Sequence, residues 1–315
     1  MTAQNTLLIL TQDADRYAEL LKPFALPDLE FVACDSLEAA ERYIDQCNII
    51  LGAPPLTAPL LDQATRLEWV QSTYAGVEAF LYPQRRSDYV LTGVKGVFEF
   101  LISEYVFGYI LARERHLFET FQQQQQKIWQ KTPYQSLQGK LLGICGLGTL
   151  GRHLAHTAKV FGMNVWGYKR SPVHLPEVER IFTATEFQEF LAQPDYVVIT
   201  LPSTPETQHL FDDAAFQAMK PSAMLINVGR GQIVSEQALI HALTQQRIHG
   251  AVLDVFEEEP LPPESPLWTL PNVLITPHNA AFSFPEDIVQ IFCDNYRRFV
   301  NHEPLLYEVD FQKGY

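Results

Sequence analysis

The chain has 315 residues, of which 47% are hydrophobic and 19% are charged, a composition typical of folded domains and unlike that of disordered chains. Its 37 acidic residues outnumber its 23 basic ones, and the formal charge of −14 disfavours nucleic acid or an anionic membrane as the main partner. At this length we expect one large or two medium domains.

Short apolar runs alternate with helix-like stretches through the first hundred residues. The predicted strands are residues 6–11, 30–33, 48–52, 68–72 and 89–92, and the predicted helices are residues 13–21 and 36–43. Buried parallel strands have this continuous apolar character, and their alternation with helices is typical of βαβ units. The first hundred residues therefore predict one α/β domain.

A single long helix is predicted from Ser103 to about Lys127. The apolar residues that recur there at near-helical spacing are Val106, Ile110, Leu117 and Phe121. Residues 129–138 then look like a connector, because Pro133 breaks any helix there.

The alternation is clearer after residue 137. The predicted strands are residues 140–145, 164–168, 195–200, 223–228, 250–254 and 273–276, and the predicted helices are residues 152–161, 187–192, 212–219, 236–246 and 286–301. This pattern predicts a second doubly wound sheet. We therefore expect an α/β protein with two doubly wound parallel-sheet domains. A flavodoxin-like substrate domain would contain residues 1–101 and 286–315, and a Rossmann cofactor domain residues 102–285, with the active site in the cleft between them.

A glycine-rich turn follows the strand at residues 140–145, and it matches GxGxxG with the sequence Gly146-Leu147-Gly148-Thr149-Leu150-Gly151. Gly146 allows the tight turn, Gly148 lets the backbone approach a pyrophosphate, and Gly151 lets helix and strand pack closely. The helix N-terminus presents free N–H groups to the anion, so Thr149 and Leu150 are candidate contacts too. The alternative is a glycine turn without a ligand, but the flanking strand and helix favour a dinucleotide.

The residues after the next strand indicate which dinucleotide binds. NAD sites place an acidic residue there to hold the adenosine ribose. This chain instead has Lys169, Arg170 and Ser171, two cations and a hydroxyl where the 2′-phosphate of NADP would lie. An ordinary basic loop is the alternative. The loss of an acid together with the gain of bases favours NADP, with NAD as the second choice.

Three polar residues follow apolar strands at the edge where open α/β sheets bind ligands: Arg230, Glu259 and His278. Taken singly they are weak signals, because most histidines are structural or exposed and a charge run such as residues 257–259 is usually a solvated loop. Together, in this order after the glycine turn, they form a more specific pattern, since they could supply a proton donor that titrates near neutrality, a carboxylate to orient it and a cation beside a developing oxyanion.

The order of these residues after the glycine turn resembles the D-isomer-specific 2-hydroxyacid dehydrogenases, a family that includes glyoxylate/hydroxypyruvate reductases and phosphoglycerate dehydrogenase. The resemblance covers nearly the whole chain, and other matching segments are WVQSTYAGV at residues 69–77, SEY at 103–105, LPSTPET at 201–207 and VLDVF at 252–256. The closest pattern is that of the short glyoxylate/hydroxypyruvate reductases.

This resemblance implies roles by position. Arg230 would bind the substrate carboxylate and polarise the keto oxygen, His278 would be the acid/base, and Glu259 would pair with it. The loop implied to grip the substrate carboxylate contains Tyr74, Ala75, Gly76 and Val77. Further cofactor contacts are implied for Pro202, Thr207, Val228 and Asp254, the last near the nicotinamide carboxamide. The chain departs from the family pattern at Lys169, discussed above, and at Asn279, where an aliphatic residue commonly follows the histidine.

The substrate is expected to be a short 2-keto acid such as glyoxylate or hydroxypyruvate, reduced to the D-2-hydroxy acid. The aromatic residues Tyr74, Phe98 and Phe100 would line the pocket or, equally, belong to the core. The family implies a homodimer. Two alternatives stay open: a cofactor-sensing scaffold like the family's corepressors, and another hydride transfer on the same fold, such as formate or phosphonate oxidation.

The four cysteines form no CxxC motif and no cluster with histidine, so neither a structural zinc site nor a disulfide framework is expected. Reduced thiols suit the cytoplasm. The first basic residue is Arg16, which makes the N-terminus a poor secretion signal, and no apolar run reaches about 18 residues, so no membrane span is expected.

Overall fold

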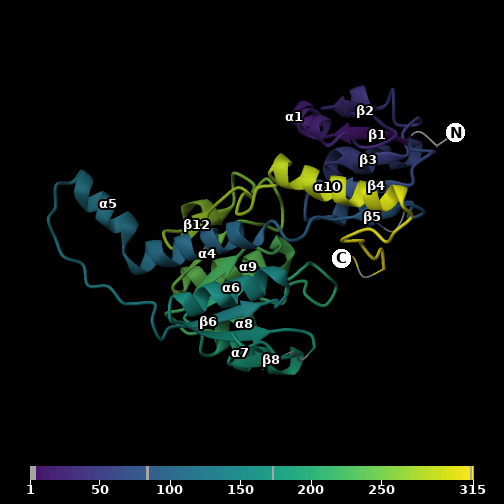
Figure 1. Cartoon of the computed structure of the whole chain (residues 1–315). Helices are drawn as coiled ribbons and strands as arrows, with labels where there is room; N and C mark the ends of the chain where they lie inside the picture. The colour runs from purple at the N-terminus through teal and green to yellow at the C-terminus, as the bar shows by residue number, and fades with distance from the viewer. Residues whose placement is uncertain (1–4, 83–84, 172–173, 313, 315) are drawn as a thin grey trace. The chain divides into compact units, whose positions relative to one another are not determined.

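The computed structural model describes residues 5–82, 85–171, 174–312 and 314, and the chain folds into two compact units. Unit 1 contains residues 1–97 and 283–315, and unit 2 contains residues 98–282. These boundaries lie a few residues before the expected ones. Figure 1 shows the C-terminal helix, in yellow, beside the strands of the N-terminal unit, so the first unit is discontinuous in sequence.

Unit 1 is built on a five-stranded parallel sheet in the order β2-β1-β3-β4-β5. Its strands are β1 (Asn5–Leu10), β2 (Leu29–Cys34), β3 (Ile49–Gly52), β4 (Trp69–Ser72) and β5 (Val90–Thr92). Its helices are α1 (Ala14–Leu21), α2 (Leu37–Ala40), α3 (Pro54–Thr57) and α10 (Pro285–Val300).

The two faces of this sheet are covered by different parts of the chain. Leu8, Ile50 and Val70 belong to one apolar cluster with residues of the α2–α3 region. The neighbouring Trp69 points to the other face, because side chains alternate along a strand, and it stacks on Phe292 of α10 with ring centroids 5.1 Å apart. The C-terminal helix thus completes the core that the first hundred residues begin.

Unit 2 is built on a seven-stranded parallel sheet in the order β12-β11-β10-β9-β6-β7-β8. Its strands are β6 (Leu141–Cys145), β7 (Asn164–Tyr168), β8 (Arg180–Phe182), β9 (Tyr196–Ile199), β10 (Met224–Asn227), β11 (Gly250–Leu253) and β12 (Val273–Ile275). Its helices are α4 (Glu99–Glu114), α5 (Leu117–Gln125), α6 (Thr149–Val160), α7 (Phe187–Leu191), α8 (Asp213–Ala218) and α9 (Glu236–Thr244). Short 3-10 helices in the two units are Lys22–Phe24, Ala58–Gln63, Glu78–Phe80, Ala184–Glu186, Gly231–Ile233 and Pro266–Thr269.

This strand order confirms the predicted fold class. The chain runs outward from β6 to β8, returns to β9 beside β6, and then runs outward in the other direction. The reversal between β6 and β9 is the topological switch point at which doubly wound sheets bind ligands. The glycine turn at residues 146–151 follows β6 and therefore lies at this point.

The predicted single helix from Ser103 to Lys127 is wrong. α4 begins earlier, at Glu99, and ends at Glu114, and His116 takes a left-handed φ of +51° before α5 starts. Val106 and Ile110 are fully buried, but Leu117 and Phe121 are 53% and 61% exposed. The apolar spacing continues across the break by coincidence, because Leu117 and Phe121 lie on α5, a helix with no buried face.

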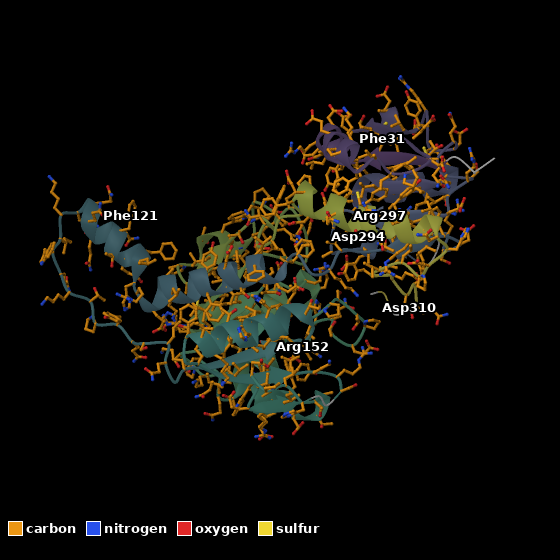
Figure 2. All side chains as sticks on the ribbon, in the orientation of Figure 1. Phe31, Phe121, Arg152, Asp294, Arg297 and Asp310 are labelled. Atoms are coloured by element: carbon orange, nitrogen blue, oxygen red, sulfur yellow. The ribbon has the colours of Figure 1, made fainter. Side chains whose placement is uncertain are left out.

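The α5 helix and the segment that follows it extend away from the rest of unit 2 (Figure 1). Large apolar side chains lie exposed on them; Figure 2 labels Phe121 among these. The sequence analysis also missed β8, a three-residue edge strand, and the one-turn helix α3. Across the described parts of the chain, no helix has the length and hydrophobicity needed to cross a membrane.

Candidate active site

The three candidate catalytic residues lie at one edge of the sheet of unit 2. Arg230 follows β10, Glu259 lies in the loop after β11, and His278 follows β12. These strands are neighbours and parallel, so their carboxyl ends share one edge. Residues far apart in sequence are therefore brought together by the strand order.

His278 and Glu259 form a direct pair. His278 Nδ1 donates to Glu259 Oε2 at 2.6 Å, and the other carboxylate oxygen accepts from the Phe256 N–H at 2.9 Å. An ionised carboxylate can only accept, so this contact places a proton on Nδ1 and leaves Nε2 as the outward nitrogen. The imidazole is 54% exposed, which leaves it accessible to a ligand.

The pair shifts both pKa values in the direction that favours charge. The hydrogen bond to Glu259 raises the pKa of His278 above its ordinary 6.5, against the opposing effect of burial. Burial acts to raise the pKa of Glu259, but the hydrogen bonds from His278 and Phe256 outweigh it, and the net shift is below the usual 4.5. The site therefore favours an imidazolium beside a carboxylate.

Arg230 is close enough for its charge to act on both partners, lowering the pKa of Glu259 and of His278. A close backbone contact explains its position. A Cβ on Gly231 would lie 1.8 Å from the Phe256 carbonyl oxygen, so only glycine lets the loop after β10 pack on the loop that carries Glu259. The Arg230 guanidinium also donates to the Gly229 carbonyl at 2.8 Å.

Asp254 holds the segment that carries His278. Its buried carboxylate accepts from Thr276 Oγ1 at 2.6 Å and from the N–H groups of Asn279 and Ala280 at 2.9 and 3.0 Å. Its backbone carbonyl accepts from the His278 N–H at 2.9 Å. His278 has a left-handed φ of +51°, a strained conformation for a side chain of this size. These four bonds hold it there.

The family resemblance implied a contact with the cofactor for Asp254, and no sequence pattern indicated this hydrogen-bonding role. Tyr105 was not predicted either; its hydroxyl lies 2.7 Å from Thr276 Oγ1 and so connects α4 to the same segment. The available signal was the SEY segment at residues 103–105, one of the segments that match the family. Asn279 contributes its backbone N–H, and its side chain is exposed.

The glycine turn has the geometry that a pyrophosphate requires. Gly146 has a φ of +105°, and a Cβ on Gly151 would lie 1.9 Å from the Gly146 carbonyl oxygen. A Cβ on Gly148 would meet nothing within 4 Å, so the space in front of the turn is open. No side chain caps the start of α6 at Thr149. These N–H groups can bind the phosphates of a dinucleotide.

The predicted adenosine contacts lie at the neighbouring strand end. Lys169 is half-buried at the end of β7, and Arg170 and Ser171 are exposed. Arg170 pairs with Glu206 at 3.5 Å, an exposed pair that a phosphate can replace. Thr207 donates to the Pro202 carbonyl at 2.7 Å and thereby closes the turn after β9. Val228 is buried at the end of β10.

The predicted substrate loop belongs to unit 1, where it follows β4. Tyr74 is 45% exposed, Ala75 is exposed, Gly76 is half-buried, and Val77 is buried. Of the other two aromatic candidates, Phe98 is buried and Phe100 is exposed against His153. Arg230, Glu259 and His278 belong to unit 2. That this loop binds the same substrate as they do stays a prediction.

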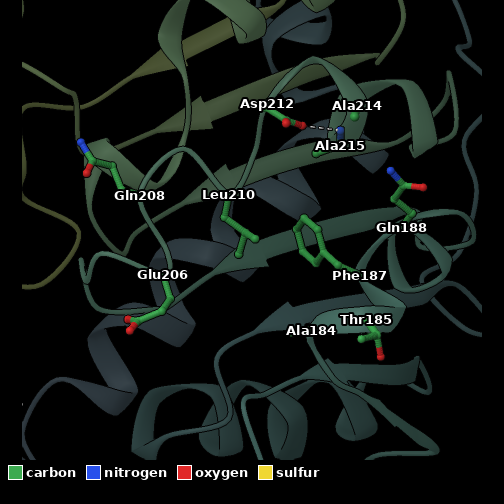
Figure 3. Close-up of a pocket in the computed structure, with 10 residues that line it drawn as sticks. All are labelled: Ala184, Thr185, Phe187, Gln188, Glu206, Gln208, Leu210, Asp212, Ala214 and Ala215. Atoms are coloured by element: carbon green, nitrogen blue, oxygen red, sulfur yellow. Dashed lines mark hydrogen bonds between the residues drawn. The ribbon is translucent and has the colours of Figure 1, made fainter.

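A pocket of about 480 Å³ lies elsewhere on unit 2 (Figure 3). Phe187 and Leu210 are among its lining residues, and Asp212 beside them caps α8 through the Ala215 N–H. None of the three candidate catalytic residues lines it. Among the described residues, no group of three or more His, Cys, Asp or Glu side chains could hold a metal ion.

A family model described as D-isomer specific 2-hydroxyacid dehydrogenase, NAD binding domain, matches residues 107–280. The chain is 33% identical over 284 residues to glyoxylate/hydroxypyruvate reductase B of Klebsiella pneumoniae (strain 342), covering 87% of each protein. A structure of a D-isomer specific 2-hydroxyacid dehydrogenase family protein from Aeromonas salmonicida has 47% identity and a TM-score of 0.95, covering 98% of this chain and 100% of that one. The NADPH-dependent glyoxylate/hydroxypyruvate reductase from Sinorhizobium meliloti, in complex with NADP and sulfate, has 27% identity and a TM-score of 0.86, covering 99% and 100%.

The His278–Glu259 contact predicts the titration of one imidazole. In an NMR titration of the intact chain, we expect His278 to titrate above 6.5, and Glu259→Gln to bring its pKa back toward that value because the carboxylate acceptor is lost. Histidines elsewhere in the chain serve as internal controls. An unchanged His278 titration in the variant would show that the pair does not form in solution.

Proposed function

The chain belongs to the D-isomer specific 2-hydroxyacid dehydrogenase family, and we propose that it reduces a short 2-keto acid, of the glyoxylate or hydroxypyruvate type, to the D-2-hydroxy acid with NADPH. The observation that carries this proposal is the 2.6 Å contact between His278 and Glu259 beside Arg230. Relatives of this chain named glyoxylate/hydroxypyruvate reductase support the substrate class.

Reduction of a keto acid needs a hydride on the carbonyl carbon and a proton on its oxygen. A reduced nicotinamide, when bound, supplies the hydride. His278 supplies the proton from Nε2, since its Nδ1–H is directed to Glu259. Glu259 keeps the imidazole charged until transfer, because it raises the pKa of His278.

Arg230 complements this pair. Its guanidinium stabilises the negative charge that develops on the keto oxygen, and its fork geometry suits the adjacent carboxylate of the substrate. The family resemblance implies a contact with the substrate carboxylate for the backbone amides around Ala75, Gly76 and Val77 in unit 1, and we include it in the proposal.

Two features of unit 2 and one related structure support a bound NADP. The open turn at Gly148 leaves space for a pyrophosphate, and Lys169 and Arg170, at the end of the next strand, are the cations we propose for the 2′-phosphate. The Sinorhizobium meliloti relative was solved with NADP. NAD stays the second choice, because neither cation excludes a ribose without the extra phosphate.

We propose a homodimer formed through α5 and the segment after it. The exposed apolar side chains on this part of unit 2 are Leu117, Phe118, Phe121, Ile128, Trp129 and Tyr134, and Trp129 is 99% exposed. A monomer rarely exposes so many large apolar groups together. A cytoplasmic location is proposed on the four free, buried cysteines.

The rival functions differ in their chemistry. A cofactor-sensing scaffold would bind NADPH without turnover on a wide panel of keto acids, and formate or phosphonate oxidation would give different products. A spectrophotometric screen of 2-keto acids with NADPH and NADH in parallel separates the reductase from the scaffold. Assays of formate and phosphonate with the oxidised cofactors test the third function. We expect NADPH oxidation with glyoxylate or hydroxypyruvate.

His278→Ala is expected to lower kcat by roughly 10²–10⁴, because the proton donor is removed, with NADPH affinity near normal. In the unaltered protein, keto acid reduction should fall as the pH rises through the raised pKa of His278, since only the protonated imidazole donates. In Glu259→Gln this fall should move to lower pH. A His278→Ala variant with normal turnover would remove this residue from its role.

A pair of glycine variants tests the cofactor turn. Gly148→Ala should leave the melting temperature near normal, since its Cβ meets open space, but should weaken NADPH binding by at least about tenfold by blocking the phosphate approach. Gly151→Ala should destabilise the fold itself, because its Cβ would overlap the Gly146 carbonyl oxygen. Normal NADPH affinity in Gly148→Ala would place the phosphates elsewhere.

The preference between the cofactors depends on two cations. Lys169→Ala with Arg170→Ala should raise the KM for NADPH by about 10–100-fold and leave the KM for NADH little changed, because only NADPH loses charge-assisted contacts. Arg247→Ala, which removes one exposed charge from the loop before β11 in unit 2, is the control. Equal effects on both cofactors would contradict a 2′-phosphate site.

A further inference from the structure

Unit 1 contains a buried polar network at the start of the proposed substrate loop. Gln71, the third residue of β4, is fully buried, as are Thr92 of β5 and Asn295 of α10. A buried amide costs free energy unless its donors and acceptors are all paired. These residues come from three distant parts of the sequence, so their pairing fixes how the parts meet.

All the hydrogen-bonding groups of the Gln71 amide are paired. Its Nε2 donates to the carbonyl oxygens of Ser72 and Gly93 at 3.0 and 2.9 Å. Its Oε1 accepts from Thr92 Oγ1 at 2.8 Å and from Asn295 Nδ2 at 3.1 Å. A flipped amide would direct donors at donors, so only one orientation fits.

Asn295 connects this amide to the C-terminal segment. Its Nδ2 also donates to the Leu306 carbonyl at 3.1 Å, and its Oδ1 accepts from the Leu306 N–H at 2.7 Å. Trp69 supports the same network, since its Nε1 donates to Thr92 Oγ1 at 2.8 Å and its ring stacks on α10. The network therefore runs from residue 306 through α10 to the end of β4.

The loop begins where the network ends. Ser72, whose carbonyl accepts from Gln71, uses its hydroxyl to donate to the Tyr74 carbonyl at 2.9 Å and to accept from the Tyr74 N–H at 3.1 Å. The Thr73 N–H donates to the Gly52 carbonyl at 3.1 Å. The Gln71 amide thus fixes the position of the Ser72 carbonyl, and this position sets the direction in which the backbone continues after Ser72.

We infer that Gln71 and Asn295 are positioning residues for substrate binding: through this chain of amides, the C-terminal helix α10 sets the conformation of the loop at residues 72–77. Neither side chain contacts the substrate, because both are fully buried. The inference rests on the proposed function, in which this loop binds the substrate carboxylate. The C-terminal segment that contains α10 and Leu306 would thereby affect the KM for the keto acid.

The test compares Asn295→Leu and Gln71→Met with Asn48→Leu in the full-length chain. Asn48 is a matched control, since it is also a buried asparagine of unit 1 with three hydrogen bonds, to Thr6, Asn5 and Glu68, but it precedes β3 at the opposite edge of the sheet. Thr92→Val, which removes one donor to Gln71, is a milder variant for use where the others do not fold.

We expect Asn295→Leu and Gln71→Met to raise the KM for the keto acid by on the order of tenfold, with kcat and NADPH affinity changed much less. The double variant should be no worse than the more affected single variant, because both act through one contact. Asn48→Leu should lower the melting temperature without changing KM. Thr92→Val should give the same effect at smaller size.

Hydrogen exchange of the peptide covering residues 72–77 provides a readout that needs no turnover. It should become faster in Asn295→Leu and Gln71→Met and stay unchanged in Asn48→Leu. Unchanged exchange and unchanged KM in folded variants would overturn the inference, as would an equal rise of KM in Asn48→Leu. An unaltered protein that reduces no 2-keto acid would instead refute the proposed function, while exchange would still decide whether the amides position the loop.

Discussion

The candidate active site depends on the buried carboxylate of Asp254, which is not itself one of the groups proposed to react with the substrate. Asp254 is almost fully buried, and its charge is stabilised by three hydrogen bonds from the segment at residues 276–280. Loss of a buried acceptor leaves its donors unpaired, at about 1–3 kcal/mol for each. That free energy is comparable with the strain of a non-glycine residue in the left-handed region. Asp254 can therefore hold His278 in a backbone conformation that the histidine would not adopt alone.

Both units hold a loop at the carboxyl end of a strand, but they use different side chains to do so. In each parallel sheet, the loop that carries a functional group leaves the carboxyl end of a strand, where the ladder of backbone hydrogen bonds stops. In unit 2 the Asp254 carboxylate accepts hydrogen bonds from such backbone N–H groups. In unit 1 the Gln71 amide donates to backbone carbonyl oxygens. The carboxylate binds only donors, which suits a segment that presents N–H groups. The amide both donates and accepts, which suits a position between two carbonyl oxygens and two further side chains.

The parts of the fold that carry a strong local signal were predictable from sequence. The long buried strands and the glycine turn were predicted near their observed positions, because continuous apolar runs and glycines at fixed spacing are local properties. The α4–α5 break was not, since neither glycine nor proline marks it and His116 takes the left-handed conformation instead. β8 has only three residues at the edge of the sheet. The hydrogen bonds of Asp254 and Gln71 join segments distant in sequence, so no local pattern could reveal them.

The net charge of −14 is unfavourable for the binding of anionic ligands. A dinucleotide phosphate and a keto acid are both anions, so the long-range field of the protein opposes their approach. Binding must then depend on short-range groups at the strand ends. The groups proposed for this role are Lys169 and Arg170 after β7, Arg230 after β10, and the uncapped N–H groups at the start of α6. All lie at the carboxyl edge of one sheet, so they can contact a ligand there over short distances. Recognition of these anions would then be governed by the geometry of the strand-end loops rather than by the overall charge.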